Sequence, residues 1–265
     1  MSVGTRSRRE TEAAPRAAVE GAPLEEVLAE LYARQLAIDP DNQYLRGHGS
    51  RASIANQVRT FDWYRPHLPD GGTVLDWGCH HAPDSCLLRA RFGERLQLHG
   101  CDLVDSDRFQ CFHAFAGFSY EQLRDVSGLP YPSDFFDVVI GSGVLEHVAM
   151  DYESLKELYR ILKPDGLLVL SYLPNWLAVQ EWVRRVIQKS EFHRRLYAMA
   201  ETKQLLKRSG FYPFAARYHT FFWERLLARA GLPRDGRAAQ LAATLLPVQI
   251  FSSTLCFMAR KVIMM

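Results

Sequence analysis

Short apolar runs alternate with helix-forming segments along most of the chain, and this alternation is the strongest constraint on its fold. We expect strands at 73–76, 96–102, 119–125, 136–141, 167–172, 212–219 and 253–262. We expect helices at 23–38, 51–64, 83–92, 151–162 and 201–209. Strands that alternate with helices favour a parallel sheet with right-handed crossovers. The pattern therefore predicts an α/β, doubly wound, mostly parallel seven-stranded sheet.

The composition is that of a globular protein. Of the 265 residues, 48% are hydrophobic and 23% are charged, both ordinary values for a folded domain. No apolar run approaches the roughly 20 residues that span a bilayer. Residues 1–21 lack the apolar segment of a secretory signal, and we expect a flexible leader there. The five cysteines are an odd number, which favours reduced thiols and a cytoplasmic location.

Charge is unevenly distributed along the chain. Residues 1–180 carry 17 Lys and Arg against 25 Asp and Glu, whereas residues 181–237 carry 13 against 5. A basic last third suits an anionic substrate, or peripheral contact with an anionic membrane surface. Solvated arginine faces on ordinary helices explain the same pattern, so both interpretations stay open.

The helical segments divide the chain into expected parts. Residues 1–21 are the leader, residues 22–68 form an N-terminal helical lid, and residues 69–265 form the sheet domain. Two helical insertions interrupt that domain, at 176–200 and 221–249. The first insertion begins with an amphipathic run that fits a membrane-surface helix or a helix packed on the domain.

Short motifs follow one another at the ends of the expected strands. They are Val74-Leu75-Asp76-Trp77-Gly78-Cys79, Gly100-Cys101-Asp102, Asp125 before Leu129-Pro130-Tyr131-Pro132, Phe136-Asp137-Val138-Val139-Ile140, Val144-Leu145-Glu146-His147-Val148 and Leu162-Lys163-Pro164-Asp165-Gly166. In this order they resemble a class I S-adenosylmethionine-dependent methyltransferase, closest to the ubiquinone/menaquinone-biosynthesis-like (methyltransferase type 11) branch. The resemblance implies a Rossmann-like fold with S-adenosyl-L-methionine as the cofactor.

The resemblance also implies where the cofactor binds, at the carboxyl ends of the first strands. It implies that Asp76 reaches the methionine ammonium, Asp102 the ribose hydroxyls and Asp125 the adenine amino group. The implied cofactor-binding residues are Asp76, Gly78, Cys79, His80, Asp102, Leu103, Asp125, Val126 and Ser142. The family pattern has glycine where this chain has His80 and Ala82. Either the His80 ring points away from the cofactor, or binding is weakened.

Methyl transfer from a sulfonium is an in-line displacement that mainly needs aligned reactants in a dry pocket. His147 is the candidate catalytic base, because an imidazole accepts a proton near neutral pH. Packing and capping of the next helix is its alternative role. Candidates for the acceptor side are Tyr44, Arg46, His48, Tyr172, Asn175, Trp176, His193 and Tyr197.

These observations predict methyl transfer to a small-molecule, lipid or glycan acceptor, with oxygen and nitrogen acceptors favoured. Nucleic acid is disfavoured, because neither an Asn-Pro-Pro-Tyr type motif nor a Pro-Cys nucleophile occurs. No metal site is expected without a Cys-x-x-Cys pair. The alternative is a non-catalytic methyltransferase-like partner or regulatory protein with an altered cofactor turn. A nicotinamide dehydrogenase is disfavoured because its Gly-x-Gly-x-x-Gly pattern is missing.

Overall fold

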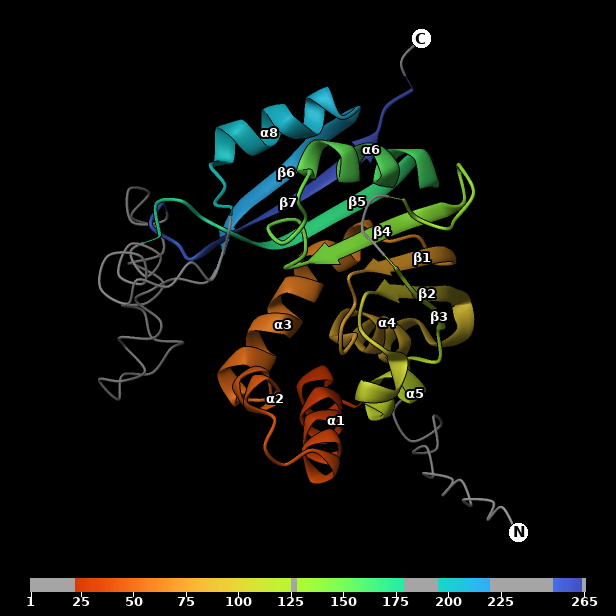
Figure 1. Cartoon of the computed structure of the whole chain (residues 1–265), viewed down its shortest axis with the longest axis vertical. Coiled ribbons are helices and arrows are strands. Elements are labelled where there is room, and N and C mark those ends of the chain that lie inside the picture. Colours follow the sequence, from red (N-terminus) through yellow and green to blue (C-terminus); the bar gives the residue numbers. More distant parts are fainter. Residues whose placement is uncertain (1–21, 125–127, 179–194, 220–249, 264–265) are drawn as a thin grey trace, which may run out of the picture.

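The computed structural model describes residues 22–124, 128–178, 195–219 and 250–263, and a seven-stranded sheet crosses the molecule (Figure 1). The strands are β1 (Gly72–Trp77), β2 (Leu96–Asp102), β3 (Ser119–Gln122), β4 (Phe136–Ser142), β5 (Leu162–Pro174), β6 (Phe211–His219) and β7 (Thr254–Lys261). They lie in the order β3-β2-β1-β4-β5-β7-β6. Strand β7 is antiparallel to both neighbours, and the other pairs are parallel. The predicted fold class is confirmed.

Helices cover both faces of the sheet (Figure 1). They are α1 (Leu24–Ile38), α2 (Gln43–His48), α3 (Arg51–Tyr64), α4 (Pro83–Phe92), α5 (Gln110–Ala116), α6 (Asp151–Ile161) and α8 (Met199–Arg208). Helices α1 to α5 pack on the face that carries Val74 and Val138. Helices α6 and α8 pack on the face that carries Leu75 and Val139. Successive strand residues point to opposite faces, so each inner strand contributes to both cores.

Two helices were not expected from the sequence. Asn42, in the Pro40-Asp41-Asn42 break, also begins α2, because its side chain accepts a hydrogen bond from the Leu45 N–H at 3.0 Å. Helix α5 is short and ends at Gly117, which has a left-handed φ of 57°. Short helices carry too little periodicity to be recognised, since most of their stability comes from tertiary packing.

One edge of the sheet gathers the polar strand ends. Strands β1, β2, β4, β5 and β6 run in the same direction, so their carboxyl ends share this edge. Helices α1 to α3, in the range predicted as a lid, reach it: the Tyr172 hydroxyl at the end of β5 donates to the Asn56 carbonyl at 3.3 Å. Ligands of doubly wound sheets bind at such an edge.

Other predicted features fall outside the described residues. The leader (1–21) lies there, as do residues 179–194 and 220–249, which make up most of the two predicted insertions. Within the described ranges, no helix has the length and apolar character needed to cross a membrane.

Candidate functional site

The turn that follows β1 has a left-handed backbone at three positions, and two of them carry a residue other than glycine. Gly78 has a φ of +66°, and a Cβ there would lie 2.6 Å from Val144 Cγ2, so this position requires glycine. His80 and Ala82 also have positive φ values, of 48° and 56°. Each costs roughly 1 kcal/mol or more for a residue with a Cβ. The chain therefore holds the backbone path of the family turn at an energetic cost.

Backbone hydrogen bonds hold this turn against β2. The Asp102 carboxylate accepts the His80 N–H at 2.8 Å and the Val104 N–H at 3.1 Å. The His113 ring donates to the His80 carbonyl at 2.7 Å, and the Gly78 N–H donates to the Cys101 carbonyl at 2.8 Å. Each carboxylate oxygen can accept more than one hydrogen bond, so Asp102 keeps capacity for a ligand.

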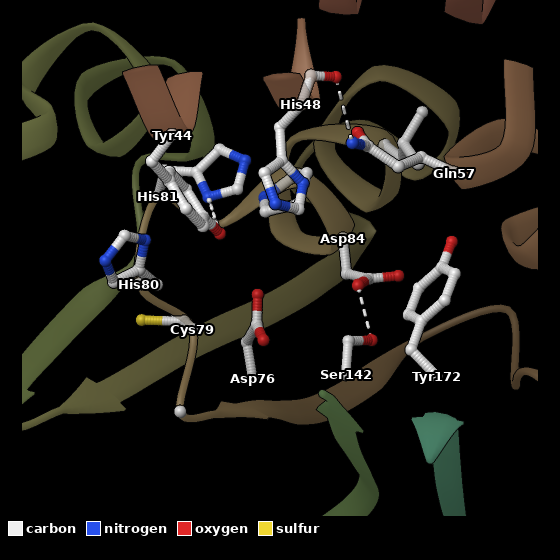
Figure 2. A pocket seen from close by; sticks show the side chains of 13 residues that line it. Tyr44, His48, Gln57, Asp76, Cys79, His80, His81, Asp84, Ser142 and Tyr172 are labelled. Carbon is white, nitrogen blue, oxygen red and sulfur yellow. Dashed lines mark hydrogen bonds between the residues drawn. The ribbon is translucent and has the colours of Figure 1, made fainter. Parts of the chain in front are cut away.

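The His80 ring lies to one side of the site. Its centroid is 4.4 Å from that of Phe109 and 4.7 Å from that of Tyr44. In Figure 2 the ring lies beneath Tyr44 and is turned away from Asp76 and Ser142. The ring therefore forms a side wall of the site and does not stand between Asp76 and Ser142.

A cavity opens between this turn, the strand ends and the N-terminal helices (Figure 2). Its volume is about 80 Å³. Its walls are formed by Tyr44, His48, Gln57, Asp76, Gly78, Cys79, His80, His81, Pro83, Asp84, Leu87, Ser142 and Tyr172. The cavity thus joins the ends of β1, β4 and β5 to α2, α3 and α4.

Two buried carboxylates line the cavity. Asp76 is 3% exposed. One of its oxygens accepts hydrogen bonds from both the N–H and the hydroxyl of Ser85, at 3.3 and 2.6 Å. Asp84 is 6% exposed and accepts the Tyr64 hydroxyl at 2.5 Å and the Ser142 hydroxyl at 2.7 Å. Burial raises the pKa of both carboxyls, and the charge of Asp84 raises the pKa of Asp76 further.

The cavity wall has negative but no fixed positive charge. Among the described residues, no Lys or Arg lines it. Burial lowers the pKa of His48, His80 and His81, so these rings are neutral near pH 7. Such a site favours a ligand that brings positive charge.

The N-terminal helices are tied to the turn through His81, which is 3% exposed. Its Nε2 lies 2.7 Å from the Tyr32 hydroxyl of α1, and its Nδ1 lies 3.3 Å from the Tyr44 hydroxyl of α2. The Gln57 amide of α3 donates to the Tyr32 hydroxyl at 2.9 Å. A neutral imidazole has one donor and one acceptor nitrogen, so one ring links three helices to the turn.

The far wall of the cavity carries a strained aromatic residue. Tyr172 has a φ of 62°, at the point where the pairing of β5 with β7 shifts register. Its hydroxyl donates to Thr60 Oγ1 at 2.9 Å, and Thr60 Oγ1 lies 3.0 Å from His219 Nε2. Left-handed φ values are rare for aromatic residues and are found at functional sites.

The structure gathers part of the predicted cofactor set. Those that line the cavity are Asp76, Gly78, Cys79, His80 and Ser142. Asp102 lies behind the turn, and Leu103 is 52% exposed. Asp125 and Val126 lie outside the described residues. His147 is outside the cavity wall with about half of its side chain exposed, 3.9 Å from the buried Glu146, and its role as a base stays a prediction.

The acceptor-side candidates separate into two groups. Tyr44, His48 and Tyr172 line the cavity. The others do not: Asn175 is buried and donates to the backbone carbonyls of Ile250 and Ser252. Tyr197 donates to the Leu145 carbonyl. Arg46 and Trp176 are exposed, and His193 lies outside the described residues.

Sequence reasoning missed three polar residues of the cavity wall, namely Gln57, His81 and Asp84. The position of Asp84 in the first turn of the helix after β1 was a usable signal, because that turn faces the carboxyl end of the strand. Gln57 and His81 left no local signal. Among the described residues, no group of three or more His, Cys, Asp or Glu could hold a metal ion.

Residues 46–215 match the methyltransferase domain family. The match covers well over half of the chain, so this chain belongs to that family. The predicted class, an S-adenosylmethionine-dependent methyltransferase, is confirmed. The match names no branch within the class, and the ubiquinone/menaquinone-like branch stays a prediction.

Individual relatives agree with this assignment. A Mycolicibacterium smegmatis protein, described as a probable S-adenosylmethionine-dependent methyltransferase, is 27% identical over 65% of this chain and 69% of its own length. An Arabidopsis thaliana tRNA (carboxymethyluridine(34)-5-O)-methyltransferase is 28% identical over 43% of this chain. The matched segment makes up only 26% of that relative. A solved Haloferax volcanii complex of the Trm112 methyltransferase activator with a methyltransferase gives a TM-score of 0.62 at 18% identity, covering 91% of this chain and 98% of that one. At that identity the likeness shows the fold alone.

Proposed function

We propose that this protein transfers a methyl group from S-adenosyl-L-methionine to the oxygen or nitrogen of a small-molecule, lipid or glycan acceptor. The observation that carries the proposal is the turn after β1. Its backbone keeps positive φ values at Gly78, His80 and Ala82, although two of these residues are not glycine. Strain of this kind persists where a surrounding structure enforces it, most often at ligand sites.

The residues present fit the methionine end of this cofactor. At Gly78 a Cβ would clash with the Val144 side chain, so the backbone of the turn stays bare there. One oxygen of Asp76 makes no hydrogen bond with a described residue, and Figure 2 shows the Asp76 side chain directed into the cavity. A carboxylate without a cationic partner suits an ammonium group. Asp102, at the end of β2, would receive the ribose hydroxyls.

When bound, S-adenosyl-L-methionine would supply an electrophilic methyl carbon on a sulfonium, which an acceptor lone pair would attack in line while the sulfur leaves as a neutral thioether. The residues of the chain orient the reacting groups and exclude water from them. Tyr44, His48 and Gln57 cover the cavity from the N-terminal helices, and a dry site strengthens electrostatic contacts. Tyr172, on the opposite wall, is well placed to orient an acceptor.

The second candidate is a non-catalytic methyltransferase-like partner or regulatory protein. The observation that favours it is the His80 side chain on the cavity wall, at a position where the resemblance to the family implies glycine. The side position of the ring, against Phe109 and Tyr44, weakens this candidate.

The predicted location and partners are part of this proposal. We expect a cytoplasmic protein that contacts membranes peripherally through its basic last third. Much of that segment (181–237) lies outside the described residues. The neighbour that is solved with Trm112 and the relative that acts on tRNA give two further partners worth assaying, an activator protein and tRNA.

Calorimetric titration with S-adenosylhomocysteine tests the proposal. We expect micromolar binding by the intact protein and at least a tenfold loss in Gly78→Ala, about 1.4 kcal/mol, because the new Cβ meets Val144. Gly47→Ala is the matched control, since a Cβ at Gly47 meets nothing within 4 Å. Absence of binding by the folded intact protein would favour the non-catalytic candidate.

A further inference from the structure

The cavity holds one more carboxylate than the methionine ammonium requires. We propose that Asp84 is the second member of a charge-sensing pair with Asp76, and that it makes the protein bind the sulfonium donor more tightly than the neutral thioether product. This inference rests on the proposed function. It assigns Asp84 as a specificity-determining residue that distinguishes the two forms of the cofactor by charge.

The first support is the geometry of the pair. Asp76 is the second-last residue of β1, and Asp84 lies in the first turn of α4, so the two approach the same cavity from consecutive elements. Both are more than nine-tenths buried and both line the cavity. Figure 2 shows the two side chains on neighbouring parts of the wall. Two carboxylates that share one buried site repel when both are ionised.

The second support is what surrounds them. Hydroxyl groups, not cations, hold the pair: Ser85 donates to Asp76, and Tyr64 and Ser142 donate to Asp84. The other titratable groups that act on the pair or share its wall are Cys79, His80 and His81 in the turn, Asp102 on β2, Tyr44 and His48 on α2, Cys86 on α4 and Tyr172 on β5. None of these is a cation near neutral pH, because the pKa of each histidine is lowered. The Tyr64 and Ser142 hydroxyls and the helix dipole at the start of α4 favour the ionised form of Asp84.

The third support is the match to the donor's charges. The ammonium is present in both donor and product, whereas the sulfonium charge is present in the donor alone. The resemblance implies that Ser142, at the end of β4, binds the cofactor. Ser142 donates directly to Asp84 at 2.7 Å, so we assign the sulfonium to the side of the cavity where Asp84 lies. Asp76 is then matched to the charge that both forms carry, and Asp84 to the charge that methyl transfer removes.

A proton balance follows from this arrangement. Repulsion and burial keep one proton on the pair in the ligand-free protein near neutral pH. Donor binding favours two ionised carboxylates, so the proton leaves to solvent. Product binding requires only one ionised carboxylate, and the proton stays. Donor affinity should therefore rise with pH more steeply than product affinity.

Calorimetry with S-adenosylmethionine and S-adenosylhomocysteine tests the inference. Titrations at pH 6, 7 and 8, in two buffers of different ionisation enthalpy, give both affinities and the protons released. For the intact protein we expect donor binding about tenfold tighter than product binding at pH 8 and release of about one proton with the donor. In Asp84→Asn we expect the ratio of the two affinities to fall to about one, without proton release. The control is Asp107→Asn, which changes an exposed carboxylate.

A second variant keeps the inference testable if Asp84→Asn does not fold. Ser142→Ala removes one hydroxyl donor and leaves the carboxylate, which should raise the pKa of Asp84 and move the onset of donor preference to higher pH. The same donor-to-product ratio in the intact protein and in Asp84→Asn, with both ligands bound, would overturn the role of Asp84 and leave the proposed function standing. No binding of either ligand by the folded intact protein would overturn both.

Discussion

The two ends of the cofactor edge are built differently. At the methionine end, Asp76 and Asp84 are buried beneath α2 and α3, in a cavity without fixed cations among the described residues. At the ribose end, Asp102 is half-buried and its neighbour Leu103 is 52% exposed. Charge recognition gains most where water is excluded, whereas hydrogen bonds to hydroxyl groups tolerate solvent. From this contrast we expect the methionine end of the proposed cofactor site to decide whether a ligand binds.

The largest expected effect tests this contrast directly. We expect Asp76→Asn to weaken binding of S-adenosylmethionine about 100-fold, because it removes a buried charge. Asp102→Asn should weaken it only about tenfold, since solvent screens that carboxylate. Calorimetric dissociation constants compare the two, with Asp107→Asn as the surface control. Equal losses at both ends would contradict the comparison.

The second prediction concerns the helices that cover the methionine end. His81→Leu should lower the free energy of unfolding by about 1–3 kcal/mol, because the buried Tyr32 hydroxyl loses its partner on the turn. Tyr44→Phe should cost less than about 1 kcal/mol, since its contact to His81 is 3.3 Å long and Tyr44 is 43% exposed. Urea unfolding measures both. A larger loss in Tyr44→Phe would show that His81 does not hold the helices.

The third prediction concerns the cost of the carboxylate pair to stability. A carboxyl with a raised pKa binds protons more strongly in the folded state, so the stability of the folded protein falls as pH rises toward that pKa. Asp84→Asn removes the cost. In the ligand-free protein at pH 8, this substitution should raise the free energy of unfolding by about 1 kcal/mol and the melting temperature by a few degrees. The gain should shrink toward pH 5, which thermal melts at both pH values check. A variant that is less stable at pH 8 would contradict the burial argument.

The smallest effect is expected at the turn itself. His80→Gly removes left-handed strain of roughly 1 kcal/mol, but it also removes the ring contacts with Phe109 and Tyr44. These changes nearly cancel, so stability should move by less than about 1 kcal/mol and cofactor affinity by less than about threefold. Ala82→Gly removes left-handed strain at a position that has no aromatic ring. It therefore separates the effect of backbone strain from the effect of ring packing. A large gain in affinity in His80→Gly would show that the ring does obstruct the cofactor.

Local patterns were sufficient for the order of elements. Helices at 51–64 and 83–92 were predicted with the bounds that the structure shows, because Ser50 and Pro83 mark their starts. Strand β5 begins at Leu162, five residues before the predicted start at 167, because an isolated pairing of Leu162 with Phe136 extends it through an apparent turn. Such pairing depends on a partner strand and leaves no mark on local periodicity.

The sequence by itself determined the fold class, the glycine at position 78, and Asp76 and Asp102 at the strand ends, because strand ends and tight turns are written in adjacent residues. Only the tertiary structure decided that Asp84 faces the same cavity as Asp76 and that the His80 ring turns aside. It also decided that His81 bonds to Tyr32, 49 positions away along the chain. The physical reason is that hydrogen bonds and repulsion between distant residues depend on how helices pack on the sheet. Local periodicity records only which side of each element is buried.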